Sequence, residues 1–221
     1  MKRAIILFFL VMLFVACGGS KPIRDWVNIS HSQMETFKNH ALTGRTQTAD
    51  VHFKKAIEEI KKSGNIDLLA KAYLTKMAVQ TALSEETNAD DFLRVDAVES
   101  FNENKSYYFF LAGEFERVDE KVLPAVYRPL QNALRKGQAF VETQKLLDKI
   151  DDPLSRLIAA GIFVRTGKAD EAVLRTAVDT ASEQGWKKAL ILYLGRLRSY
   201  YDQKGQTAKA AAVRARLALI E

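Results

Sequence analysis

Apolar side chains recur with the period of an α-helix in every long patterned segment of residues 26–221, and no segment alternates cleanly as a half-buried strand does. In residues 46–62 the apolar side chains fall on one face of such a helix: Ala49, Phe53, Ala56, Ile57 and Ile60. The same pattern predicts helices over residues 65–83, 169–181 and 186–201. We therefore expect an all-α fold.

Short connections that each carry a glycine join the predicted helices at residues 43–45, 112–114, 166–168 and 204–206. Glycine readily adopts the left-handed conformation that ends a helix. Short connections also force neighbouring helices to run antiparallel. Asp152 followed by Pro153 is typical of a helix start, with aspartate as the cap and proline in the first turn. These features predict a chain of antiparallel helical hairpins.

The middle of the chain is less regular. We expect a short helix within residues 87–101, a kink or a helix start near Pro124, and a further helix within residues 138–150. Four consecutive aromatic residues occupy positions 107–110. Because consecutive residues point to different sides of a helix, we expect two of the four to fill the core and the others to touch an adjacent helix layer.

A weak repeat follows the glycine connections. Its best example is Gly44 followed by Ala49, Phe53 and Ala56, and the glycines at 167 and 205 are also followed five residues later by alanine. This pattern resembles the tetratricopeptide (TPR) repeat, in degenerate form, over residues 25–221. The resemblance implies helical hairpins stacked as a TPR-like solenoid. An irregular all-α bundle with chance glycine spacing is the alternative.

The first sixteen residues have the layout of an export signal. Lys2 and Arg3 precede an unbroken apolar run over residues 4–15. A helix of that length spans about 18 Å, which is short of the roughly 30 Å hydrocarbon core of a bilayer. A basic start, a short apolar middle and a small residue at the end predict a cleaved secretory signal rather than a permanent membrane span.

The only cysteine lies where this apolar run stops. Residues 14–18, Phe-Val-Ala-Cys-Gly, resemble the lipobox of bacterial lipoproteins, with Phe14 where leucine is usual. The resemblance implies cleavage after Ala16 and attachment of a diacylglyceryl group, carrying fatty-acyl chains such as palmitate, to Cys17. Gly18, which is not Asp, resembles the sorting pattern for outer-membrane delivery. An ordinary cleaved signal that leaves Cys17 as an unmodified thiol is the alternative.

These features divide the chain into a signal peptide at residues 1–16, a lipidated cysteine with a flexible tether at 17–25, and an all-α TPR-like domain at 26–221. Removing the signal removes two basic residues and leaves 31 basic against 27 acidic residues. This small excess is not a nucleic-acid footprint, so we expect no nucleic-acid partner. A single cysteine excludes an intrachain disulfide and an all-thiolate metal site.

Motifs for catalysis and cofactor binding are absent from the sequence. The histidines at 31, 40 and 52 lack the one-turn spacing of metal ligands, and there is no nucleophile elbow, P-loop or dinucleotide fingerprint. Paired carboxylates at 58–59, 85–86, 90–91 and 151–152 are sequence neighbours, which point about 100° apart on a helix and make poor acid/base dyads. We expect no catalytic residues, no metal, no cofactor and no enzymatic activity.

The C-terminal part of the chain is basic, with Arg196, Arg198, Arg214 and Arg216 close together in sequence. Such a cluster usually forms a solvated face, and recognition of an acidic partner is the less common use.

The resemblances together imply an envelope lipoprotein, anchored through Cys17 in the outer membrane and facing the periplasm. Stacked helical hairpins present an extended surface that suits a protein or peptide partner, so we expect a non-catalytic interaction scaffold or assembly factor. Two alternatives stay open. A cell-wall enzyme with a lone glutamate acid requires a raised pKa in a deep cleft. A carrier of a lipid or small apolar molecule requires a closed apolar cavity.

Overall fold

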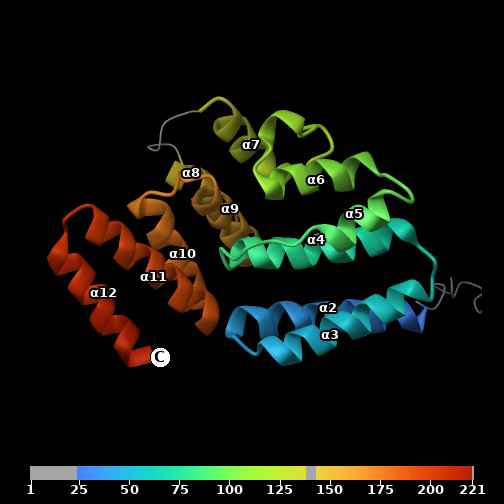
Figure 1. Ribbon diagram of the computed structural model, residues 1–221, viewed down its shortest axis with the longest axis horizontal. Helices are drawn as coiled ribbons and strands as arrows, with labels where there is room; N and C mark the ends of the chain where they lie inside the picture. Colours follow the sequence, from blue (N-terminus) through green and yellow to red (C-terminus); the bar gives the residue numbers. More distant parts are fainter. Residues whose placement is uncertain (1–23, 138–142, 221) are drawn as a thin grey trace, which may run out of the picture.

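The computed structural model describes residues 24–137 and 143–220, and every regular element in these two ranges is a helix (Figure 1). The all-α class predicted from the sequence is thus confirmed. The α-helices are α2 (Asp25–Thr43), α3 (Thr46–Lys61), α4 (Ile66–Ala82), α5 (Asp90–Asp96), α6 (Asn102–Ala112), α7 (Arg128–Arg135), α8 (Thr143–Asp148), α9 (Pro153–Arg165), α10 (Glu171–Glu183), α11 (Lys187–Gln203) and α12 (Thr207–Ile220). Two single turns of 3-10 helix are η2 (Phe115–Arg117) and η3 (Ala125–Tyr127).

Helices α2 and α3 form an antiparallel hairpin that turns at Gly44. Gly44 has φ 98°, in the left-handed region, and its N–H closes the last turn of α2 on the carbonyl of His40 at 3.0 Å. All five apolar residues predicted on one face of residues 46–62 are buried. Phe53 of that face packs against Phe37 of α2, with ring centroids 5.0 Å apart. Apolar burial therefore joins the two helices along their length.

Helix α4 lies at the centre of the molecule, in contact with α2, α3, α5, α6 and α9 (Figure 1). Asn65 caps it, because its side chain accepts the N–H of Leu68 at 2.9 Å. Buried residues occur around most of its circumference, including Ala70, Leu74 and Met77. A helix that is apolar on nearly all sides is stable only when other elements cover it on nearly all sides.

The C-terminal third consists of α9 to α12, in which each helix packs against the next. Asp152 caps α9 as predicted, accepting the N–H of Ser155 at 2.7 Å, and Pro153 occupies the first turn. The Tyr193 side chain is fully buried in α11, and its hydroxyl donates to the carbonyl of Leu157 in α9 at 3.3 Å. Two further contacts join segments far apart in sequence, α4 with α9 and α11 with α2.

In the middle of the chain, α5 and α6 pack on the side of α4 away from α2 and α3, and α8 packs against α9 and α10 (Figure 1). Phe109 and Phe110 are buried and Tyr107 and Tyr108 partly buried, so the predicted division of the aromatic run is confirmed. The helical segment η3–α7 begins immediately after Pro124, also as predicted. The helix expected within residues 138–150 is α8, from residue 143.

The signal peptide expected at residues 1–16 and the lipid site at Cys17 lie outside the described residues. Helix α2 begins at Asp25, one residue before the boundary expected between tether and domain. In the ranges 24–137 and 143–220, no helix combines the length and the hydropathy needed to cross a bilayer.

Candidate functional site

The connection between α4 and α5 forms one wall of a hollow of about 510 Å³. We name it the arginine hollow, and its lining residues are Ser84, Glu85, Glu86, Thr87, Gly161, Val164, Arg165 and Arg196. These residues come from the α4–α5 connection, from α9 and from α11. The site therefore depends on the packing of three segments that are distant in sequence.

A close approach between α4 and α9 builds the base of the hollow. A Cβ atom added to Gly161 would lie 1.8 Å from the carbonyl oxygen of Thr81, far inside any allowed contact. Only glycine permits this approach, which sets the middle of α9 directly against the last turn of α4. Arg165 is one helical turn beyond Gly161 on the same face of α9, so its side chain reaches the α4–α5 connection.

Arg165 makes three hydrogen bonds, two to that connection and one to the last turn of α4. Its guanidinium donates to the Thr87 hydroxyl at 2.7 Å, to the Glu85 carbonyl at 3.2 Å and to the Thr81 hydroxyl at 3.4 Å. Burial lowers the pKa of Arg165 from its ordinary value. Arginine nevertheless stays protonated in proteins, so the half-buried side chain brings a full positive charge to the hollow.

Arg196 approaches the same connection from α11 and donates to the carbonyl of Ser84 at 3.1 Å. Ser84 has φ 55°, and it is a non-glycine residue held in the left-handed region. Such a backbone costs about 1–2 kcal/mol and persists because the surroundings impose it. Both arginines bind carbonyls just beyond the C-terminal end of α4, where cations offset the partial negative charge of the helix.

Two acidic residues, Glu85 and Glu86, also line the arginine hollow. Glu85 pairs with Lys188 of α11, with Oε1 and Nζ 2.7 Å apart. Neither Arg165 nor Arg196 forms an ion pair with a carboxylate within the described ranges. Glu86 is exposed. Two guanidinium groups thus border a hollow that also carries Glu85 and Glu86, and neither guanidinium is bound to a carboxylate. A guanidinium without a bound carboxylate can accept an anionic group of a ligand.

The sequence pointed to only part of this site. Arg196 belongs to the predicted basic cluster, but Arg214 and Arg216 are exposed on α12 and do not line the hollow. The sequence did not indicate that Arg165 or the α4–α5 connection belongs to a site. The one available signal was Gly161, because a glycine inside an apolar helix often marks a close approach of another backbone. That signal does not say which helix approaches.

The structure brings together two of the three histidines. The rings of His40 and His52 stack with centroids 5.4 Å apart, and Nδ1 of His52 lies 2.6 Å from the side-chain oxygen of Gln33. His31 is exposed, with Nε2 3.7 Å from Glu35. Across the described part of the chain, no three His, Cys, Asp or Glu side chains are grouped as metal ligands would be.

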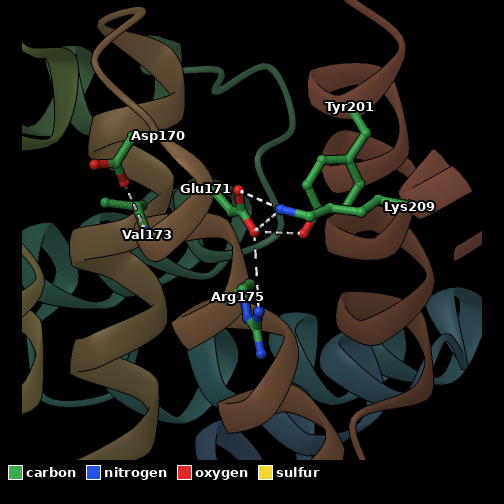
Figure 2. A network of polar contacts seen from close by, with 6 residues as sticks. All are labelled: Asp170, Glu171, Val173, Arg175, Tyr201 and Lys209. Atoms are coloured by element: carbon green, nitrogen blue, oxygen red, sulfur yellow. Dashed lines mark hydrogen bonds and ion pairs between the residues drawn. The ribbon is translucent and has the colours of Figure 1, made fainter. Parts of the chain in front are cut away.

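A second polar cluster joins α10, α11 and α12 around Glu171 (Figure 2). Its carboxylate accepts hydrogen bonds from the Tyr201 hydroxyl at 2.8 Å and from Lys209 Nζ at 3.1 and 3.2 Å, and Arg175 lies 3.9 Å away. Hydrogen bonds from Tyr201 and Lys209 lower the pKa of Glu171. We interpret this cluster as structural, holding three helices together, because Tyr201 and Lys209 already bind the Glu171 carboxylate.

Two other carboxyl groups also have lowered pKa values. Burial alone would raise the pKa of Asp67, but hydrogen bonds from Lys71 and Asn104 outweigh it. A hydrogen bond from Asn102 lowers the pKa of Asp119. A general acid at neutral pH needs the opposite shift. None of Asp67, Asp119 and Glu171 therefore has the property that a lone catalytic acid requires.

Comparison with known proteins adds no relative: no protein-family model, no curated protein and no solved structure matches the chain.

Proposed function

We propose that this chain is a lipid-anchored protein of the cell envelope that acts as a non-catalytic interaction scaffold. In this proposal Cys17 carries the lipid, and the anchor holds the helical domain at the outer membrane, facing the periplasm. Support for the anchor comes from residues 14–18, which resemble a lipobox directly after an export-type apolar run.

The arginine hollow is the contact that we assign to a partner, and the partner's matching feature is an acidic segment. The observation that carries this assignment is the convergence of Arg165 and Arg196 on one hollow with no carboxylate paired to either within the described ranges. Carboxylates bind guanidinium groups in bidentate geometry, and such bonds are among the stronger hydrogen bonds in proteins. A glutamate, an aspartate or a chain terminus can supply the carboxylate.

The finer architecture that we propose is a short TPR-like stack of hairpins. Supporting features are the left-handed glycines at the ends of α2 and α9, and the burial of Ala49 and Ala210 at the positions that the resemblance specifies. The segment from α5 to α8 then forms an insertion between α4 and α9. Contact between α11 and α2 is additional to the nearest-neighbour stacking of such a solenoid.

The test is capture of a partner from envelope extract by the soluble Cys17→Ser form under mild crosslinking, with the crosslinked peptide identified. We expect an acidic peptide linked to the hollow, and we expect Arg196→Gln to lose it. Arg198→Gln is the matched control, because Arg198 lies two residues along the same helix and does not line the hollow. Equal capture by both variants, or no enriched envelope protein, would contradict the proposal.

A further inference from the structure

The first turn of α2 projects apolar side chains beyond the body of the molecule. Every residue from Arg24 to Ile29 is exposed or partly exposed, and the first buried residue is Ser30. Trp26 is partly exposed, Val27 is 37% exposed and Ile29 is 43% exposed. Three large apolar side chains within four residues, one of them tryptophan, are therefore at least partly open to solvent at the start of this helix.

The packing of the hairpin leaves this turn at an outer end. The α2–α3 hairpin meets α11 near its turn, where a Cβ on Gly44 would lie 3.4 Å from Cβ of Lys188. Because α2 and α3 are antiparallel, the first turn of α2 lies at the opposite end, beside the connection from α3 to α4 (Figure 1).

The start of α2 is close in sequence to Cys17, the proposed site of the lipid anchor. Arg24 is seven positions after Cys17, and seven chain steps reach at most roughly 25 Å even when fully extended. The start of α2 therefore lies within about 25 Å of an acylated Cys17. Tryptophan is favoured at the level of lipid headgroups, where one edge of its ring meets water and the other meets acyl chains.

We infer that the first turn of α2, through Trp26, Val27 and Ile29, docks into the bilayer surface beside the lipid anchor; this inference rests on the function proposed above. The contact is apolar rather than electrostatic. At this end of the hairpin the basic residues Arg24, Lys61 and Lys62 are matched in number by the acidic residues Asp25, Glu58 and Glu59, and Lys62 is paired with Glu59 at 2.6 Å. Docking to a bilayer of neutral phosphatidylcholine is therefore expected, without a requirement for anionic lipid.

Docking has a consequence for the arginine hollow. Helix α4 begins at Ile66, near the docked end, and its last residue, Ala82, comes just before the hollow. Seventeen residues of helix span about 25 Å. A molecule fixed at two points, the lipid and the helix turn, would hold the hollow away from the membrane, where a partner can reach it.

The two tryptophans of the chain, Trp26 and Trp186, provide the test. The acylated mature protein, which begins at Cys17, is reconstituted in phosphatidylcholine vesicles that contain bromine-labelled lipid, which quenches only nearby tryptophans. Trp186→Phe leaves Trp26 as the sole reporter, and Trp26→Phe leaves Trp186. Trp186 lines a hollow with Asn39, thirteen residues or about 20 Å along α2 from Trp26. We expect several-fold stronger quenching of Trp26 than of Trp186.

A further pair of variants tests the side chains themselves in the Trp186→Phe background. Val27→Ser with Ile29→Ser should reduce the quenching of Trp26, whereas Val51→Ser, 49% exposed on α3, should not. Equal quenching of the two tryptophans, or no effect of the Val27 and Ile29 changes, would overturn the docking. The intact mass of the same preparation separates the two proposals. Acylation without quenching overturns only the docking, and a chain without acylation overturns both.

Discussion

Gly161 and Gly195 both lie inside helices, but their surroundings are opposite. A Cβ on Gly161 would meet the Thr81 backbone at 1.8 Å, whereas a Cβ on Gly195 would meet nothing within 4 Å. The first glycine is therefore required by the contact between α9 and α4. The second brings only the entropic cost of glycine in a helix.

We expect Gly161→Ala to lower the free energy of unfolding by about 3 kcal/mol, because a backbone atom cannot move aside as a flexible side chain can. The matched control, Gly195→Ala, should raise it by roughly 0.5–1 kcal/mol through helix propensity alone. Urea unfolding followed by circular dichroism measures both. Similar effects of the two substitutions would show that α4 and α9 are not in close contact.

Single residues also show how far the sequence could be interpreted. Buried positions such as Ala49 and Phe53 were predictable, because helical periodicity states which face is apolar. Arg165 was not predictable, because its role depends on the Glu85 carbonyl and the Thr87 hydroxyl, about eighty positions earlier in the chain. Periodicity identifies a face of a helix but not the element that covers it.

At the scale of elements, few contacts hold α12 to the rest of the described molecule. Its contacts are mainly with α11, and its buried residues are Ala210 and Leu217. Hydrogen bonds from Tyr201 and Lys209 to Glu171 therefore tie the last three helices together (Figure 2). Arg214 and Arg216 of the basic cluster are exposed on α12, and so is Lys209.

We expect Glu171→Gln to lower the free energy of unfolding by about 1 kcal/mol at pH 7, since the carboxylate is half-buried and accepts bonds from two donors. The folded pKa of Glu171 lies below its unfolded value. Its stabilisation is therefore complete above the unfolded pKa, about 4.3, and is lost as the pH falls through the folded pKa. The difference between wild type and variant should disappear at low pH.

Glu103→Gln is the matched control, because Glu103 occupies the first turn of α6 as Glu171 does in α10. It should lose only the interaction with the helix dipole, a few tenths of a kcal/mol. Chemical denaturation of the three proteins between pH 3 and pH 7 gives the comparison. An equal loss in both variants would mean that the Glu171 cluster does not stabilise the fold.

Element boundaries were the most predictable part of the structure, because their signals are local. Asn65 and Asp152 cap α4 and α9, and Gly44 and Gly113 end α2 and α6 in the left-handed region. The long interval between Gly113 and Gly167 is explained by η2, η3, α7 and α8, which separate α6 from α9.

At the scale of the whole molecule, two long-range contacts decide the shape, α4 with α9 and α11 with α2. Neither contact was predictable from the sequence. Helix caps, glycine turns and periodicity identify a helix and its connection to the next one, but not a distant helix that packs against it. The arginine hollow results from the first of these contacts. Arg165 and Arg196 of the hollow project from the helices α9 and α11, and rigid helices hold charged groups at fixed positions, as the proposed scaffold requires.

The claim on which the proposed function depends is that a lipid on Cys17 holds this helical domain at the membrane. Intact mass spectrometry of the protein from its native membrane fraction tests it directly. We expect a chain that begins at Cys17 and carries the added mass of a diacylglyceryl group. A chain that still begins at Met1, or a cleaved chain with an unmodified thiol in the soluble fraction, would contradict the claim.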